Sequence, residues 1–513
     1  MESKTILTID CGTQSLRGIL FSSRGKILAH AQVIYDAYFS HNPGWAEQDP
    51  LIYWKSLLKA CHRLKKASPT WFDAIEGVGI TAQRASMVNV DKKGDPLRPV
   101  IIWLDKRSSK PVWSQKPIIG PVLKIMGLKK KIQAVESQGK CNWIMQNQPE
   151  IWQKTDKYLQ LSGFLNFKLT GEFRDSTASQ IGHLPFRYKK QVWAKPFHLE
   201  RLLFPVEPQK LPQLVLPGEL LGNITTIASE QSGLKKGIQV FACGSDKGCE
   251  TLGAGVLSSK MASLSFGTAA TIQTLSEKYI EPIKLMRPYP ACVPNLYNPE
   301  IEVFRGYWMI SWFKKEFAHK EVETAKNLGV PVETILDQCL ERSEPGAMGL
   351  IVQPYWGAGL DHPDAKGAMI GFGDAHTKDH VYRAVIEGLG FALFEGMQKI
   401  EKKSKVKFVK AAVSGGASQS DAICRITADI FNLPMEKGQT HETSSLGAAI
   451  LTAKGLGWYP DIQNAVKQMV KVKHVFEPDP ANVRIYKDLY SQVYRQMYGA
   501  LKPLYKKIRQ ITG

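Results

Sequence analysis

Short apolar runs separated by polar, glycine-containing turns mark the start of the chain. Residues 5–9 (TILTI) are apolar and run into Asp10-Cys11-Gly12-Thr13, a pattern that indicates a buried strand ending in a turn. Residues 16–21 and 26–33 repeat this pattern on either side of another turn. The chain is therefore predicted to open with three consecutive strands joined by tight turns.

Helical spacing and further strands follow this opening. Apolar residues recur at helical spacing over residues 50–65, so a helix is predicted there. Residues 74–80 then indicate a buried strand, and residues 120–170 are mostly helical in pattern. A stretch rich in proline and glycine over residues 211–222 predicts turns.

The middle of the chain repeats its beginning. Residues 239–243 form a predicted strand that ends in Gly244-Ser245-Asp246, and residues 261–265 form another that enters Gly267-Thr268. The second of these segments, LSFGTAA over residues 264–270, parallels IDCGTQS over residues 9–15. Because the two copies lie about half the chain apart, they favour two duplicated domains with a boundary near residues 245–255.

The second half continues with alternating helices and strands. A helix is predicted over residues 381–402, a strand over 408–413 that reaches Gly415-Gly416-Ala417, and helices over 419–431 and 444–454. The last 35 residues are predicted to form one amphipathic helix with a basic face. We therefore expect domains over 1–247 and 248–480, followed by a C-terminal helix over 481–513.

Composition and charge narrow the class of protein. The formal net charge of +20 can signal a nucleic-acid partner, but the lysines fall in separate clusters without interleaved aromatic residues, which favours solvated helix faces. No apolar run approaches the ~18 residues of a membrane helix, and no signal peptide precedes the first strand. The eight cysteines are scattered and form no metal-binding or disulfide pattern. A cytoplasmic protein without nucleic-acid or membrane partners is the expectation.

The chain lacks the usual nucleotide-binding signatures, since neither a P-loop nor a G-x-G-x-x-G motif occurs. Polar residues do follow the first strand, however. Asp10 could hold Mg²⁺ through water, Gly12 would let the backbone approach a phosphate, and Thr13, Gln14 and Ser15 supply hydrogen-bond donors. Gly267-Thr268 would serve the same role from the repeated segment. The alternative for either motif is an ordinary hairpin turn.

Two further glycine-containing bends could carry chemistry. Gly415-Gly416-Ala417 lies between a strand and a helix, where free N–H groups suit phosphate and absent side chains allow an adenine to approach, although a simple strand–helix turn has the same pattern. Asp246 follows a buried strand and could accept the proton of an attacking hydroxyl in phosphoryl transfer. The alternative for Asp246 is a helix N-cap.

Gln83-Arg84 follows the strand over residues 74–80, and Trp103 follows another apolar segment with Asp105 and Arg107 close behind. Polar side chains beside an aromatic ring are typical of a sugar site. A structural ion pair between Asp105 and Arg107, and core packing of Trp103, are the alternatives.

Taken together and in this order, these motifs resemble the FGGY carbohydrate kinases, which include glycerol, xylulose, ribulose and gluconate kinases. The resemblance runs from about residue 5 to about residue 478. It rests on the residues 10–13, 43–50, 103–107, 169–171, 244–246, 267–268, 349–354 with Pro363 and Gly367, 414–417 and 445–449.

The resemblance implies an α/β fold of two actin-like, ribonuclease-H-like domains around a central cleft, the first binding sugar and the second nucleotide. It implies ATP and Mg²⁺, with Asp246 as general base and Asp10 and Asp246 at the metal. The implied ATP-binding residues are Gly12, Thr13, Gln14, Gly267, Thr268, Gly306, Gly415, Gly416 and Ala417. The implied substrate-binding residues are Gln83, Arg84, Trp103, Asp246 and Lys247. Members of the family are often dimers, which leaves a homodimer open.

The sequence also departs from the subgroups of this family. Ala85 replaces the Glu that binds glycerol in glycerol kinases, and the Met-His-Gly of xylulose kinases is absent. Lys247 could contact an anionic substrate such as a sugar acid, or be a surface lysine. We therefore expect ATP-dependent phosphorylation of a pentulose such as xylulose or ribulose, a polyol or a sugar acid. The alternative is an actin-like ATPase or nucleotide-dependent switch without a sugar substrate.

Overall fold

The computed structural model describes residues 4–357, 362 and 364–512. These residues form two compact units. Unit 1 runs to Gly253 and also contains Tyr289–Tyr297 and Ser444–Val470; unit 2 contains Ala254–Pro288, Asn298–Thr443 and the residues from Lys471 onward. The units differ from the expected ranges 1–247, 248–480 and 481–513. Residues 248–253 and two later segments belong to unit 1, and the described residues after 480 belong to unit 2.

Unit 1 is built on a six-stranded sheet of order β13-β14-β5-β1-β2-β3. Strand β1 pairs antiparallel with β2 and parallel with β5, which is in turn parallel to β14. All seven residues of β1 are buried, as its place inside the sheet requires. The strands are β1 (Thr5–Cys11), β2 (Ser15–Ser22), β3 (Ile27–Ile34), β5 (Ile75–Ala82), β13 (Leu220–Asn223) and β14 (Gln239–Phe241). The predicted opening of three strands is confirmed.

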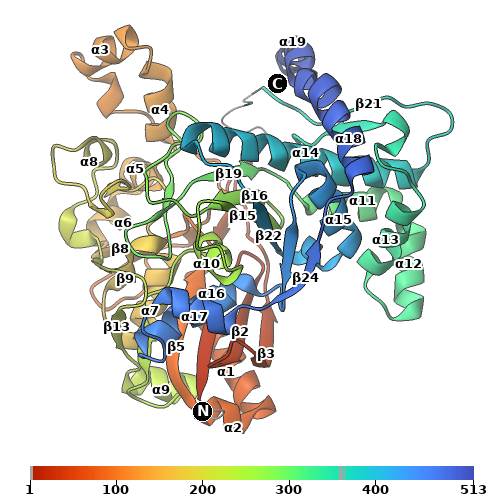
Figure 1. Cartoon of the computed structure of the whole chain (residues 1–513). Helices are drawn as coiled ribbons and strands as arrows, with labels where there is room; N and C mark the ends of the chain where they lie inside the picture. Colours follow the sequence, from red (N-terminus) through yellow and green to blue (C-terminus); the bar gives the residue numbers. More distant parts are fainter. Residues whose placement is uncertain (1–3, 358–361, 363, 513) are drawn as a thin grey trace. The chain divides into compact units, whose positions relative to one another are not determined.

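Helices surround this sheet. Helix α1 begins after Asp49, whose side chain accepts the Leu51 N–H, and its buried residues pack on β2 and β3, beside which it lies in Figure 1. Helix α1 spans Pro50–Ala67. The other helices of unit 1 are α2 (Pro69–Asp73), α3 (Ile119–Ile125), α4 (Lys129–Ser137), α5 (Lys140–Asn147), α6 (Pro149–Lys154), α7 (Leu161–Thr170), α8 (Leu199–Leu203), α9 (Thr226–Ser232), α10 (Asp246–Gly253), α16 (Thr443–Gly455), which belongs to unit 1 from Ser444 onward, and α17 (Ile462–Met469).

A second, four-stranded sheet of unit 1 has the order β4-β7-β6-β8. Its strands are β4 (Glu47–Gln48), β6 (Met87–Val90), β7 (Val100–Ile101) and β8 (Lys157–Gln160). It carries the Trp103 segment and the Gln48 side chain to the same part of unit 1 as the end of β1. The segment predicted to be mostly helical over 120–170 contains α3 to α7 with β8 between them.

Unit 2 repeats the sheet of unit 1. Its order is β19-β16-β15-β22-β23-β24, with β15 antiparallel to β16 and parallel to β22. The pairing directions follow the same sequence as in unit 1, with β15 in the place of β1. The strands are β15 (Met261–Phe266), β16 (Ala270–Thr274), β19 (Glu300–Val303), β22 (Lys410–Ser414), β23 (Met435–Gly438) and β24 (Val472–Phe476). The duplication predicted from residues 9–15 and 264–270 is therefore confirmed.

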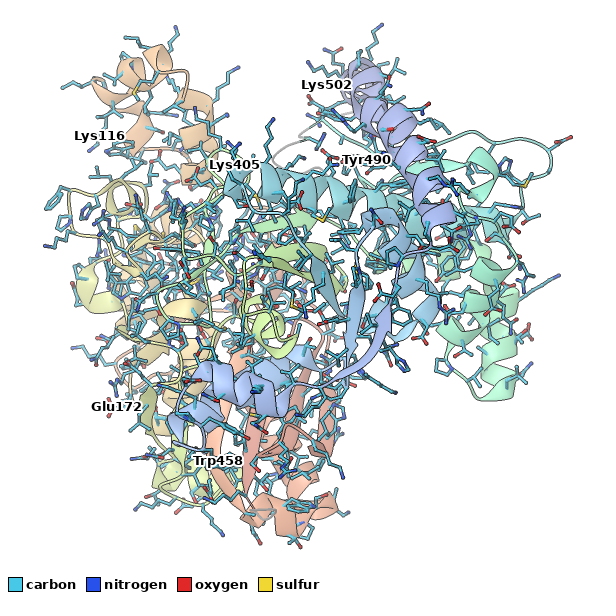
Figure 2. The ribbon with its side chains drawn as sticks, viewed as in Figure 1. Lys116, Glu172, Lys405, Trp458, Tyr490 and Lys502 are labelled. Atoms are coloured by element: carbon cyan, nitrogen blue, oxygen red, sulfur yellow. The ribbon has the colours of Figure 1, made fainter. Side chains whose placement is uncertain are left out.

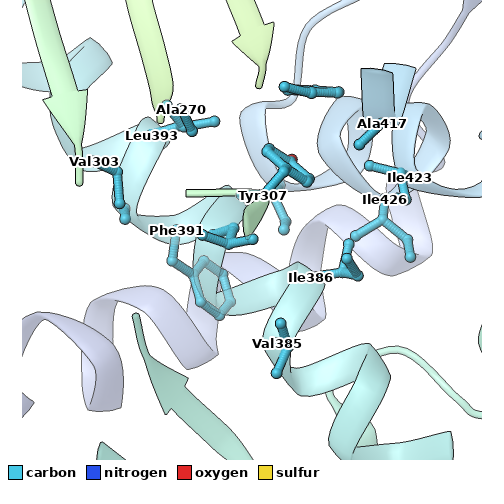
Figure 3. Packing of buried hydrophobic residues seen from close by; sticks show 14 of the residues in the cluster. Ala270, Val303, Tyr307, Val385, Ile386, Phe391, Leu393, Ala417, Ile423 and Ile426 are labelled. Atoms are coloured by element: carbon cyan, nitrogen blue, oxygen red, sulfur yellow. The ribbon is translucent and has the colours of Figure 1, made fainter. Parts of the chain in front are cut away.

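The core of unit 2 gathers around the long helix α14. Val385, Ile386, Phe391 and Leu393 of this helix pack with residues of β16, β19 and α15, as Figure 3 shows for ten labelled side chains. The helices are α11 (Trp308–Phe317), α12 (His319–Leu328), α13 (Val332–Glu341), α14 (Lys378–Ser404), α15 (Asp421–Phe431), α18 (Pro480–Asp488) and α19 (Arg495–Thr512).

Two local predictions need correction. The C-terminal residues do not form one regular helix, because a π-helical stretch, Leu489–Tyr494, separates α18 from α19 and turns Tyr490 and Tyr494 onto Phe391. The helix expected over 419–431 starts at Asp421 instead, since Gly416–Gln419 forms a 3-10 turn and Ser420 caps the helix by accepting the Ile423 N–H.

The lysine clusters lie on exposed parts of each unit. Lys130 and Lys131 of α4 are exposed in unit 1, and Lys405, just beyond α14, is exposed in unit 2, where Figure 2 labels it. Exposed lysines of this kind account for part of the net charge of +20 as solvated surface.

Candidate active site

Three segments of unit 1 end at one edge of the main sheet. Cys11 of β1 lies opposite Ala82 of β5, and Ala82 lies opposite Ser245, which follows β14. Since β1, β5 and β14 are parallel, their carboxyl ends meet at this edge, where open α/β sheets bind their ligands. Asp10, Gln83-Arg84 and Asp246 are therefore brought together, as the sequence predicts.

Asp246 is the first residue of α10 and does not cap it. The hydroxyl of Ser245 accepts the N–H of Gly248 at 3.2 Å, and this bond provides the cap. The Asp246 carboxylate instead accepts the N–H of its neighbour Lys247 at 2.8 Å and lies 3.9 Å from Nε of Arg84. About a third of its side chain, 30%, is exposed. The alternative of an N-cap aspartate is thus wrong, and the carboxylate is accessible.

Opposing influences act on the Asp246 carboxyl group. Burial raises its pKa above the ordinary value, whereas the nearby charges of Arg84 and Lys247 lower it and that of Glu250 raises it. Arg84 therefore offsets part of the cost of keeping an ionised carboxylate in this partly buried position.

Lys247 is not a surface lysine. Its Nζ lies 2.7 Å from the Glu250 carboxylate one helical turn later, and only 17% of the Lys247 side chain and 7% of that of Glu250 are exposed. The pair neutralises the charge of Lys247 beside Asp246. Glu250 was not among the predicted site residues, although its i,i+3 spacing from Lys247 is a visible signal in the sequence.

Asp10 and the turn after it are held in place by neighbouring side chains. The buried Asp10 carboxylate lies 3.5 Å from a guanidinium nitrogen of Arg17 across the β1–β2 pair. The Tyr35 hydroxyl donates to the carbonyl of Gly12 at 2.6 Å, and the Gly12 N–H donates to the carbonyl of Ser15 at 3.0 Å. Gln14 lies exposed at the tip of this turn.

A hydrogen-bond network joins predicted phosphate-binding and sugar-binding residues. The Thr13 hydroxyl donates to Gln83 Oε1 at 2.8 Å and accepts the indole N–H of Trp103 at 2.9 Å. Gln83 Nε2 donates to the Tyr53 hydroxyl at 3.0 Å, and Gln48 Nε2 donates to the carbonyl of Thr13 at 2.9 Å. The side chain of Gln83 is buried among these partners.

Two members of this network, Gln48 and Tyr53, were not predicted. Gln48 lies within the motif over residues 43–50, so its segment was singled out, but its hydrogen bond to the Thr13 carbonyl could not be predicted from the motif. The position of Tyr53 on α1 gives no signal in the sequence.

Asp105 and Arg107 form a structural ion pair, which was the alternative to a role in sugar binding. Arg107 contacts the Asp105 carboxylate at 2.8 Å and lies over the rings of Trp45 and Trp143, at 3.9 and 4.6 Å from their centroids. Asp105 also accepts the N–H of Ala46 at 2.6 Å. These contacts fix the segment that carries Trp103 and the segment that leads to Gln48.

Unit 2 gathers its predicted residues around the hairpin that repeats the β1–β2 turn. Gly267 and Thr268 lie between β15 and β16, and their carbonyls accept the N–H groups of Tyr307 and Trp308 at 3.1 and 3.4 Å. Gly306 packs so closely on the backbone of Ala270 that an added Cβ would lie 2.2 Å from its nitrogen. Figure 3 shows Ala270, Tyr307 and Ala417 in this region.

The Gly415-Gly416 bend lies beside the same hairpin. Gly415 adopts φ +83°, and a Cβ there would meet the backbone of Phe266, the last residue of β15, at 2.9–3.0 Å. Gly416 is exposed and has open space where a side chain would be, and Ala417 is buried. Unit 2 therefore brings Gly267, Thr268, Gly306, Gly415, Gly416 and Ala417 into one region.

Among the residues that the structure describes, no group of three or more His, Cys, Asp or Glu side chains could hold a metal ion. Mg²⁺ is commonly held by one or two carboxylates together with water and substrate phosphates. Asp10 and Asp246, at the same edge of the sheet, offer a donor set that fits this ion. Within the same described part, no helix has the length and apolar character needed to span a bilayer.

Comparisons with known proteins agree with this arrangement. The N-terminal domain model of the FGGY family of carbohydrate kinases matches residues 5–253, and the C-terminal domain model matches residues 262–456. A xylulose kinase of Staphylococcus epidermidis is 28% identical over 527 aligned residues, which cover 100% of this chain and 99% of the relative. A gluconokinase of Bacillus licheniformis is 26% identical over 494 aligned residues, 94% of each chain.

Solved structures show the same fold. The ligand-bound xylulose kinase from Lactobacillus acidophilus superposes with a TM-score of 0.82 at 22% identity, over 98% of this chain and 100% of that one. The gluconate kinase from the same organism also gives 0.82, over 98% and 99% of the two chains. With both domain models matched in order along a duplicated fold, the chain belongs to the FGGY family of carbohydrate kinases.

Proposed function

We propose that this sugar kinase transfers the γ-phosphoryl group of ATP to a hydroxyl of a small sugar or polyol, with Asp246 as the general base. The observation that carries the proposal is the position of Asp246. Its carboxylate is 30% exposed at the edge of the sheet where Asp10 and Gln83-Arg84 also lie, and Ser245 performs the capping that would otherwise occupy it. A base aimed at the attacking hydroxyl is one of the few groups that phosphoryl transfer requires.

The proton and the phosphoryl group follow separate paths in this reaction. As the substrate hydroxyl attacks the γ-phosphorus, its proton passes to the Asp246 carboxylate, and the bond from the γ-phosphorus to the leaving ADP oxygen breaks. Arg84, 3.9 Å from Asp246, favours the ionised form that can accept this proton. Gln83 and Trp103, which are joined through the Thr13 hydroxyl, are proposed to bind the sugar with Arg84.

We assign nucleotide binding to the glycine-containing turns. Gly12, Thr13 and Gln14 of unit 1 and Gly267 and Thr268 of unit 2 are proposed to contact the phosphates. Gly306, Gly415, Gly416 and Ala417 are proposed to contact the adenosine, because the open space where Gly416 lacks a side chain allows close approach. Asp10 and Asp246 would hold Mg²⁺, which neutralises charge on the phosphates when bound.

Neutral sugars fit the charges around Asp246 better than sugar acids do. Two cationic side chains lie near Asp246: Arg84 faces the Asp246 carboxylate, and Lys247 faces the Glu250 carboxylate. Because each cation already has a carboxylate partner, neither is left to pair with the carboxylate of a sugar acid. The relatives include both xylulose kinases and gluconokinases. We therefore place pentuloses such as xylulose and ribulose first, then polyols, and then sugar acids.

A coupled assay of ADP release with pentuloses, polyols and aldonates in the presence of ATP and Mg²⁺ tests the proposal. The expected result is turnover with at least one neutral sugar well above the rate with ATP alone. ADP release that is the same with and without every sugar, and that persists in Trp103→Ala, would instead support a nucleotide-dependent switch of the actin type.

A further inference from the structure

A short segment from the second half of the sequence completes the surroundings of Asp246. Residues Tyr289–Tyr297 lie between β16 and β19 in the chain, both strands of unit 2, yet they pack with unit 1. The hydroxyl of Tyr297 donates to the carbonyl of Lys189 at 2.7 Å, and Gln191 Nε2 donates to the carbonyl of Leu296 at 2.9 Å. These two hydrogen bonds fix the C-terminal end of the segment.

The middle of the segment is seated against the bend that carries Asp246. The buried Cys292 lies so close to Gly244 that a Cβ added there would be 2.4 Å from its sulfur, and one added at Gly248 would be 3.2 Å away. The Cys292 sulfur is also 3.7 Å from that of Cys249 in α10. The two glycines on either side of Asp246 thus leave room for this segment.

The first residue of the segment contacts Arg84. The Arg84 guanidinium carbon lies 4.8 Å from the centroid of the Tyr289 ring, and Arg84 Nε lies 3.9 Å from Asp246 Oδ1. Only 14% of the Arg84 side chain is exposed. The guanidinium is therefore placed by an aromatic ring as well as by the Asp246 carboxylate.

We infer that Tyr289 is a positioning residue for the kinase reaction. Its ring holds the Arg84 guanidinium next to the Asp246 carboxylate and within the proposed sugar pocket. The inference rests on the proposed role of Asp246 and Arg84. A cation on an aromatic face is stabilised by the ring quadrupole, and more strongly when it is largely removed from water. Without the ring, the flexible Arg84 side chain would sample other rotamers, and substrate and base would lose a fixed partner.

A double-mutant cycle tests this inference. Tyr289→Phe keeps the ring and should turn over within about twofold of the wild type, whereas Tyr289→Leu should lose about five- to thirtyfold in kcat/KM, the range that a cation–ring contact can supply. In the background of Arg84→Met, Tyr289→Leu should have no further effect, because the group that the ring positions is gone. Tyr289→Gln serves as a second ring-free variant if the leucine variant does not fold.

Three results would overturn the inference. The first is an equal loss from Tyr289→Leu with and without Arg84, which would show a general structural role. The second is an unchanged kcat/KM in Tyr289→Leu, and the third is a loss in Tyr289→Phe as large as in Tyr289→Leu.

A second measurement does not depend on turnover. An arginine-specific dicarbonyl reagent should modify Arg84 faster in Tyr289→Leu than in the wild type or Tyr289→Phe, as followed by peptide mass spectrometry. Absence of sugar-dependent ADP release in the wild type would defeat the proposed function, whereas equal labelling of Arg84 in the three proteins would defeat the role of Tyr289 alone.

Discussion

Two adjacent glycines of unit 2 allow structural and functional effects to be separated. Gly415 has φ +83° and ψ 172°, a region of backbone conformation that is nearly restricted to glycine and costs other residues about 1–3 kcal/mol. A Cβ at Gly415 would also lie 2.9–3.0 Å from three backbone atoms of Phe266, and crowding in a packed interior costs about 1–3 kcal/mol. Gly416 has neither constraint, since an added Cβ meets no heavy atom within 4 Å.

We therefore expect Gly415→Ala to destabilise unit 2 by about 3 kcal/mol, within the range of about 2–6 kcal/mol that strain and crowding give together. For a unit of this size, that corresponds to a fall of about 6–12 °C in the unfolding midpoint of unit 2. Gly416→Ala should melt with the wild type. If the adenosine of ATP lies against this bend, the added methyl group of Gly416→Ala should raise the KM for ATP while leaving the KM for the sugar unchanged.

Calorimetry and steady-state kinetics on the two variants provide the test. A Gly415→Ala protein as stable as the wild type would refute the argument from backbone strain. A Gly416→Ala protein with an unchanged KM for ATP would refute the proposed contact between Gly416 and the nucleotide, whatever the stability of the other variant.

Two further predictions concern unit 1. Thr13→Val removes the hydroxyl that joins Gln83 and Trp103, and each lost hydrogen bond costs about 1 kcal/mol. We therefore expect the KM for the sugar to rise at least fivefold. A comparable rise in the KM for ATP would show instead that the hydroxyl binds phosphate. Burial lowers the pKa of Lys140 from 10.5 to about 7. Between pH 7 and 10.5 the Lys140 amine is therefore protonated in the unfolded chain but neutral in the folded protein. Because the unfolded state binds more protons in that interval, the free energy of unfolding rises with pH there. In urea unfolding, the free energy of unfolding of the wild type relative to Lys140→Met should therefore increase above pH 7 by up to about 1.4 kcal/mol per pH unit, and a difference that does not change with pH would contradict this.

The duplicated fold could be predicted because its signals are local. Each copy of the hairpin combines a buried strand with a Gly-Thr turn, and those residues occur in both halves of the sequence, at Gly12-Thr13 and Gly267-Thr268. The end of β14 likewise predicted the place of Asp246, since an apolar strand followed by Gly244-Ser245 exposes the next residue. Strand ends of this kind need no knowledge of distant contacts.

The partners of these residues could not be predicted in the same way. Tyr289 is separated from Arg84 by about 200 residues of sequence, and its segment would be assigned to the second half of the fold by position alone. The ion pair that neutralises Lys247 and the buried network around Gln83 also depend on packing. The hydroxyl of Thr13 shows the difference most clearly, because its turn was predicted while its two hydrogen-bond partners, Gln83 and Trp103, were expected to serve a separate ligand.

The role of Asp246 as the general base is tested most directly by one substitution. Asp246→Asn keeps the size of the side chain and its ability to accept the Lys247 N–H, but removes the carboxylate that accepts the proton. Single-turnover kinetics with saturating ATP and the preferred sugar should show phosphoryl transfer slowed by about 10²–10⁴-fold, the usual contribution of a general base, while binding of ATP is retained. Transfer within about tenfold of the wild-type rate, below that range, would contradict the assignment of Asp246 as the base.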